Sequence, residues 1–98
     1  MKVTWSNQAK ESLAHIYDYI FEDSPQNAAM VFDTLLELGD SLANEKVEYS
    51  KDTIINNERY RSLPKWNYKI IYERTKSGVI ILDIFNTNRN PKLLHKYK

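Results

Sequence analysis

The chain has 98 residues, enough for one small domain, and its 42% hydrophobic and 28% charged residues are the balance of a soluble globular protein. It contains no cysteine, which excludes a disulfide scaffold and a thiolate metal site and fits a reducing compartment. No apolar run approaches the length of a membrane span, and the first residues lack an apolar signal segment. We therefore expect a soluble, cytoplasmic protein.

The net charge of +1 conceals a division of charge along the chain. Residues 1–49 carry three Lys or Arg against nine Asp or Glu, a net of −6, whereas residues 50–98 carry eleven against four, a net of +7. A basic half of this size favours a polyanion or an acidic protein segment as a partner. The alternative is that charges from both halves mix on one surface.

The first half predicts a short strand and two helices. "KVTW" at residues 2–5 alternates as a strand, and Ser6 or Asn7 can cap the helix that follows. In "DSP", Ser24 is a good N-cap and Pro25 suits the first helical position, so a second helix runs from residue 25 to about residue 44. The short link predicts an antiparallel helix hairpin, in which Gly39 allows close approach to a neighbour. The expected apolar faces are Ala9, Leu13, Ile16, Tyr17 and Ile20 on the first helix, and Ala28, Phe32, Leu35, Leu36, Gly39 and Leu42 on the second.

The second half predicts three strands. After a loop at residues 45–57, with a short extended piece at residues 53–55, "ERYRSL" ends near Pro64, and "NYKIIYER" and "GVIILDIF" follow. The last two strands are apolar on both faces and are therefore expected to be central. "TKSG" forms a tight hairpin in which Gly78 can take a positive φ. In that register Arg74 faces Val79, Tyr72 faces Ile81 and Ile70 faces Asp83. The whole chain, residues 1–98, is predicted to be one α+β domain with an antiparallel sheet of three further strands and a short basic C-terminal tail.

The candidate chemistry lies in the basic half. There is no metal-binding motif, no phosphate-binding glycine loop and no nucleophile elbow, so no cofactor and no metal are expected. Arg59 and Arg61 are two residues apart, which places both on one face of a strand, and Lys69 sits on the next. Such groups could hold phosphates, and a tail His or Tyr could move a proton. A solvated basic face with an ordinary tail is the alternative reading. The full set is Arg59, Arg61, Lys69, Arg89, Lys92, His95, Lys96 and Tyr97.

Four stretches in this order resemble the RelE/ParE superfamily of type II toxin–antitoxin toxins, over nearly the whole chain. They are "LAHIYDYI", "SPQNAAMVFDTLLEL", "YRSLPKWNYKIIYE" and "ILDIFNTNRNP". The superfamily contains RelE-like enzymes, which cleave mRNA on the ribosome without a metal, and ParE-like proteins, which poison DNA gyrase. The resemblance implies neutralisation by a cognate antitoxin in a hetero-oligomer, and no membrane partner.

The RelE-like reading implies roles for individual residues. Arg61, Lys69, Arg89, His95 and Tyr97 would be catalytic, and Arg59, Lys92 and Lys96 would bind the message. Lys69 replaces the Arg of the superfamily's "YR" pair, and His95 and Tyr97 are not adjacent as in its His–Tyr pair, whereas "NRNP" resembles the ParE-like branch. The chain is a metal-independent endoribonuclease on the first reading and not an enzyme on the second. A non-catalytic module whose basic face binds an acidic segment is the remaining alternative.

Overall fold

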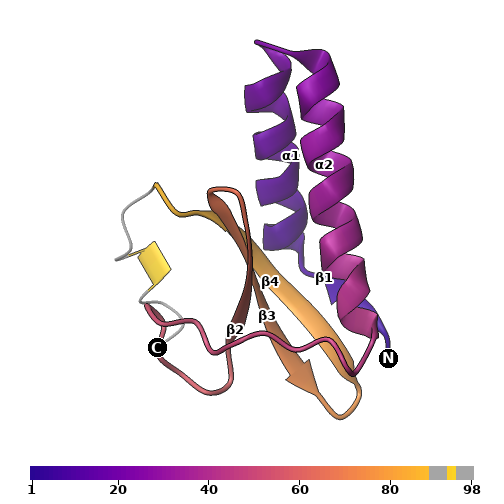
Figure 1. The fold of residues 1–98 in the computed structure, drawn as a ribbon, viewed down its shortest axis with the longest axis vertical. Coiled ribbons are helices and arrows are strands. Elements are labelled where there is room, and N and C mark those ends of the chain that lie inside the picture. The colour runs from indigo at the N-terminus through magenta and orange to yellow at the C-terminus, as the bar shows by residue number, and fades with distance from the viewer. Residues whose placement is uncertain (89–92, 95–98) are drawn as a thin grey trace.

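The structure is a computed structural model that describes residues 1–88 and 93–94. In chain order the elements are β1 (Val3–Trp5), α1 (Asn7–Phe21), α2 (Pro25–Asp40), the 3₁₀ turn η1 (Ser41–Ala43), β2 (Arg61–Lys65), β3 (Tyr68–Thr75) and β4 (Gly78–Asn86). The strands form one sheet in the order β1-β4-β3-β2. The helices form an antiparallel hairpin beside it (Figure 1). This is the α+β class that the sequence predicts, with β1 added in parallel to β4.

The helix caps agree with the sequence. The Ser6 hydroxyl accepts a hydrogen bond from the Ala9 amide, and the Ser24 hydroxyl accepts one from the Asn27 amide. The second helix ends at Asp40 rather than at residue 44, because the chain tightens there into η1. Within the predicted faces Ala9, Leu13, Ala28, Leu35, Gly39 and Leu42 are buried, whereas Ile16, Tyr17, Ile20, Phe32 and Leu36 are only partly covered; buried Val31 was missed.

Two layers of apolar side chains cover the central strands. The larger cluster joins Leu13 and Leu35 of the helices to Ile70, Tyr72 and Ile81 of the sheet. The smaller cluster, on the other side, contains Ile55, Ile71, Phe85 and Leu94. Strands β3 and β4 are therefore central and covered twice, as their continuous apolar sequences predict.

A β-bulge corrects the predicted register of the last hairpin. Arg74 pairs with Val79 and Tyr72 with Ile81, as expected, but Ile70 pairs with Ile84 and not with Asp83. Leu82 has no partner residue between the Ile71–Asp83 and Tyr72–Ile81 pairs. One extra residue reverses which side of the strand later side chains occupy, and a pattern that is apolar on both faces gives no sign of it.

The connection between α2 and β2 differs most from expectation. Residues 53–55 form a turn and not an extended piece, because a carboxylate oxygen of Asp52 accepts the amides of Ile54 and Ile55. Strand β2 starts at Arg61, two residues after Arg59, and includes Pro64. Proline is tolerated there because β2 is an edge strand, where an amide hydrogen is not required. In the described part of the chain no helix is long and apolar enough to cross a membrane.

Candidate functional site

Three of the predicted site residues lie in the described part of the chain, and each binds an acidic side chain of the same molecule. Arg59 pairs with Glu73, Arg61 with Glu48, and Lys69 with Asp52. The other predicted site residues lie outside the described residues: Arg89, Lys92, His95, Lys96 and Tyr97.

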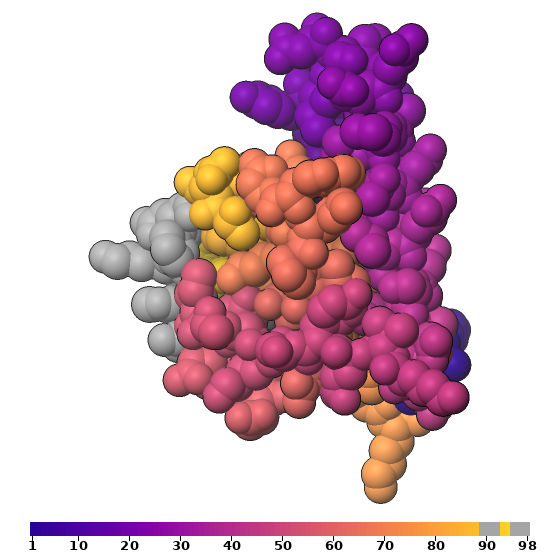
Figure 2. Space-filling view, in the orientation of Figure 1, coloured from indigo at the N-terminus to yellow at the C-terminus, as the bar shows by residue number. Residues whose placement is uncertain are grey.

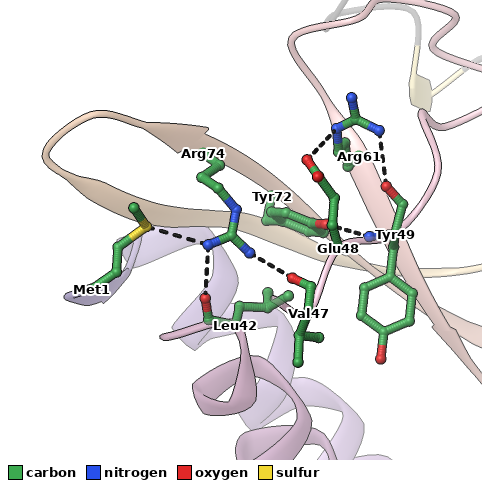
Figure 3. A network of polar contacts seen from close by, with 8 residues as sticks. All are labelled: Met1, Leu42, Val47, Glu48, Tyr49, Arg61, Tyr72 and Arg74. Atoms are coloured by element: carbon green, nitrogen blue, oxygen red, sulfur yellow. Dashed lines mark hydrogen bonds and ion pairs between the residues drawn. The ribbon is translucent and has the colours of Figure 1, made fainter. Parts of the chain in front are cut away.

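Arg61 holds the chain that follows α2. Its Nη1 donates to the Tyr49 carbonyl oxygen at 2.9 Å, and its Nε lies 3.3 Å from a Glu48 carboxylate oxygen (Figure 3). The Tyr49 amide in turn donates to the hydroxyl of buried Tyr72 at 3.0 Å. The guanidinium thus helps to position a loop whose Val47 and Tyr49 side chains also pack, partly buried, against the larger apolar cluster.

Arg74, which was not among the predicted site residues, also holds the segment that follows α2. Its guanidinium donates to the carbonyl oxygens of Leu42, at 3.2 Å, and Val47, at 2.8 Å (Figure 3). These carbonyls belong to the end of η1 and the loop after it, where no helix or sheet supplies a donor. An arginine at the end of a strand, beside an irregular stretch, was the only signal available in the sequence.

Lys69 and Asp52 form a buried ion pair. The Lys69 Nζ lies 2.6 Å from Asp52 Oδ2, and the side chains are only 10% and 1% exposed. Burial alone would raise the pKa of the Asp52 carboxyl, but the hydrogen bonds from Lys69 and the Ile55 amide, together with the Lys69 charge, hold the pKa below its usual value. The pair fastens the turn at residues 52–55 to β3.

Arg59 and Arg61 do not share a strand face, which corrects the expectation from their spacing. Arg59 precedes β2, pairs with Glu73 and lies 5.4 Å from the ring centre of Tyr60. The ion pair with Glu73 raises the pKa of Arg59 further above its usual range. Because Arg61 bonds the 48–49 segment instead, the two cations are held by different partners and not by a common ligand.

The Asp52 carboxylate predicts an acid-dependent loss of stability. The pKa of the Asp52 carboxyl is lower in the folded state than in the unfolded state. Its contribution to the free energy of unfolding is therefore fully present above the unfolded-state pKa of about 3.9, and it is lost as pH falls through the folded-state pKa. Asp52→Asn should therefore be less stable than wild type near pH 7, and the difference should narrow below about pH 4. Urea unfolding of both proteins at pH 7, 5, 4 and 3 measures this difference in the free energy of unfolding. A difference that stays constant with pH would contradict the stabilising role of the Asp52 carboxylate.

A groove lies between α1 and the far end of the sheet, with a volume of about 470 Å³. Helix α1 contributes His15, Ile16 and Tyr19, one side of the helix, and the sheet contributes Tyr68 and three asparagine amides, Asn67, Asn86 and Asn88. Burial and the neighbouring Tyr19 raise the pKa of the Tyr68 hydroxyl. Ser12, which also lines the groove, donates to a carboxylate oxygen of buried Asp83 at 2.6 Å. The lining thus combines asparagine, tyrosine and isoleucine residues.

Among residues 1–88 and 93–94, no three His, Cys, Asp or Glu side chains gather closely enough to hold a metal ion. His15, the described histidine, is exposed on α1 and lines the groove.

Comparison with known proteins places the chain in a family. The family described as "ParE toxin of type II toxin-antitoxin system, parDE" matches residues 3–91. A chain in the structure titled "Chromosomal ParDE TA system from P. aeruginosa" has a similar fold, with a TM-score of 0.72 and 20% identity over 88% of this chain and 95% of that one. No curated protein matches the sequence significantly. Since the family match spans most of its length, the chain belongs to the ParE toxin family and is the toxin component of a type II toxin–antitoxin system.

Proposed function

We propose that this toxin acts on DNA gyrase rather than on ribosome-bound mRNA, and that a cognate antitoxin holds it inactive in the cytoplasm. The observation that carries the proposal is the pairing of Arg59, Arg61 and Lys69 with acidic side chains of the same chain. These are the described cations that a RelE-like ribonuclease would need for the message.

Phosphate binding requires cations whose charge is available to the ligand. Lys69 would have to leave a buried carboxylate 2.6 Å away, and Asp52 would then be left charged without its cation. Arg61 would have to release a backbone carbonyl and Glu48. A phosphate would therefore compete with bonds that hold the loop after α2, and this cost favours a target that is recognised in another way.

The proposed antitoxin partner rests on family membership and not on a contact in the structure. The similar structure is titled as a ParDE toxin–antitoxin system, and membership in the same family supports an equivalent partner here. In this proposal the toxin is inactive while it is bound to the antitoxin in a hetero-oligomer, and it arrests growth when the antitoxin is lost.

Two assays on the purified chain test the target. We expect the toxin to inhibit supercoiling of a relaxed plasmid by gyrase, and we expect added antitoxin to restore it. In a cell-free translation reaction with one defined mRNA, primer extension should show an intact message. Ribosome-dependent breaks in the message, with normal supercoiling, would overturn the proposal.

Arg59→Ala separates the two readings, because the Arg59 side chain is 65% exposed and lies outside the strands and helices. On the gyrase proposal, inhibition of supercoiling by the folded variant should be unchanged within about twofold, since Arg59 pairs with Glu73 and not with the target. Because the Glu73 side chain is only 11% exposed and loses its partner, the melting temperature of the variant is measured first. If Arg59 instead binds a phosphate in a ribonuclease, cleavage of the message should fall by about tenfold or more, since hydrogen bonds to charged groups are worth about 1.5–3 kcal/mol. Lys76→Ala, in the exposed β3–β4 turn, is the control for loss of one positive charge.

A further inference from the structure

The β2–β3 turn contains a tryptophan where folding favours glycine. Lys65 pairs with Tyr68, so Trp66 and Asn67 form a two-residue turn. Trp66 has φ +52°, in the left-handed region that bulky side chains rarely adopt, and it is 52% exposed. The residue thus takes on backbone strain while about half of its surface stays exposed. Its one described contact, Lys65 Nζ 4.8 Å from the ring centre, is at the surface and adds little. Strain of this kind at an exposed aromatic residue points to a binding role.

The same turn borders the groove. Asn67, the second residue of the turn, lines it, and its carbonyl oxygen accepts both the amide and the hydroxyl of Thr87, which fixes the turn against the end of β4. Across the groove stands Tyr19 of α1, whose side chain is 78% exposed. The helical hairpin carrying Tyr19 projects beyond the sheet (Figure 2), so a second protein can reach this side of α1. Exposed Trp and Tyr residues beside a groove are typical of the residues that dominate protein–protein affinity.

The charges around the groove indicate what it receives. Among the residues that the structure describes, no Lys or Arg lines it. Asp18 and Glu22 do not line the groove, but both are exposed and lie within one helical turn of Tyr19, which does. Lys65, which lies over the Trp66 ring, is a cation at the turn itself. The Asn86 side-chain oxygen already accepts the Asn88 backbone amide at 2.8 Å and retains one further lone pair. That lone pair and the Asn88 side-chain oxygen can accept hydrogen bonds from a cationic side chain or a peptide backbone, and tyrosine rings attract cations. These carboxylates would repel an acidic segment.

We propose that the groove and the Trp66 turn form the surface with which the toxin docks its target protein, and that the target inserts an extended segment carrying an arginine or lysine side chain. The inference rests on the proposed function only in taking the target to be a protein. It assigns the antitoxin to a different surface. The groove volume of about 470 Å³ suits a few residues of extended chain and not a folded domain.

Trp66→Gly gives the sharpest test because stability and function should move apart. Glycine adopts a positive φ without strain, so thermal stability should be unchanged or higher. Growth arrest and inhibition of purified gyrase should both weaken by about tenfold or more, the size expected for a central aromatic contact. Tyr19→Ala should weaken both to a similar extent with the same melting temperature as wild type. Met30→Ala is the matched control, since Met30 is 52% exposed on α2 and outside the groove.

A charge-reversed variant tests whether the carboxylates near Tyr19 attract the segment. Asp18→Lys combined with Glu22→Lys should lower toxicity without changing the melting temperature, because it reverses the charges that would attract the segment. Affinity for the antitoxin, measured by calorimetry, should be within about twofold of wild type for every variant.

The outcomes separate this inference from the gyrase proposal. If the wild-type toxin fails to inhibit gyrase but the Trp66 and Tyr19 variants lose growth arrest, the docking surface is supported and gyrase is not the target. Three results would contradict the proposed docking surface. The first is full growth arrest by both variants. The second is a parallel loss of antitoxin binding, which would make the groove the antitoxin's site, and the third is a wild-type chain that arrests no growth.

Discussion

Lys69→Ala is expected to lower the free energy of unfolding by about 3–5 kcal/mol, the cost of leaving one member of a buried ion pair without its partner. Asp52 is 1% exposed and would keep only hydrogen bonds from the amides of Ile54 and Ile55 and from the Ser62 side chain, with no cation beside it. For a small domain this loss is a large part of the total, which is typically about 5–15 kcal/mol. Urea unfolding followed by tryptophan fluorescence measures it.

Lys76→Ala is the control, because Lys76 lies in the exposed β3–β4 turn and its loss should change stability by less than about 0.5 kcal/mol. A loss below about 1 kcal/mol for Lys69→Ala would mean that the pair behaves like an exposed one. Lys69 would then be available to a ligand, and a ribonuclease role would regain support. A large loss identifies Lys69 as a structural residue, whose effect on activity follows from folding.

Gly39→Ala is the second large effect, with an expected loss of about 1–3 kcal/mol from overpacking. Gly39 is buried in α2, where alanine normally improves helix stability by about 1 kcal/mol. Here a Cβ would lie 2.7 Å from Trp5 Cη2 and 2.8 Å from Cδ1 of fully buried Ile81. Because β1 and β4 carry these two side chains, the methyl group would push the helix hairpin away from the sheet.

A double-mutant cycle tests that mechanism. Trp5→Leu removes the ring that a Cβ would meet, so Gly39→Ala should cost less in that background than in wild type. The Trp5 indole also donates to an Asp40 carboxylate oxygen at 3.1 Å, and the cycle cancels the loss of this bond. Equal costs in both backgrounds would show that the contact with Trp5 is not the cause.

The local elements of this fold could be read from the sequence because their signals are short in range. Ser24 followed by Pro25 marks a helix start by hydrogen bonds and φ restriction within four residues. The Thr75–Gly78 hairpin follows from one glycine, which has φ +156° and whose Cβ would lie 2.6 Å from the Lys2 carbonyl oxygen. The close approach at Gly39 was likewise expected, although its neighbours were not identifiable.

The candidate site was predicted less well, because the availability of a charged side chain to a ligand depends on which residues the fold places beside it. Arg59, Arg61 and Lys69 were predicted for their positive charge, but their acidic partners stand 13 to 17 positions away in the sequence. No periodicity connects residues at that distance. Trp66 was overlooked for a related reason, since the strain at its φ angle exists only once the β2–β3 register is formed.

The sequence by itself determined the number and order of the elements, the caps of the helices, the central position of β3 and β4, and the superfamily. Only the tertiary structure decided which side of the sheet meets the helices. Both alternations of β3 are apolar, so a period of two cannot distinguish Ile70 and Tyr72, which pack on the helices, from Ile71, which packs on Phe85. Contacts between distant segments, whose energies exist only when the chain is folded, also decide the remaining features. These are the bulge at Leu82, the ion pairs of Arg61 and Lys69 with the loop after α2, the ion pair of Arg59 with Glu73 of β3, and the groove beside α1.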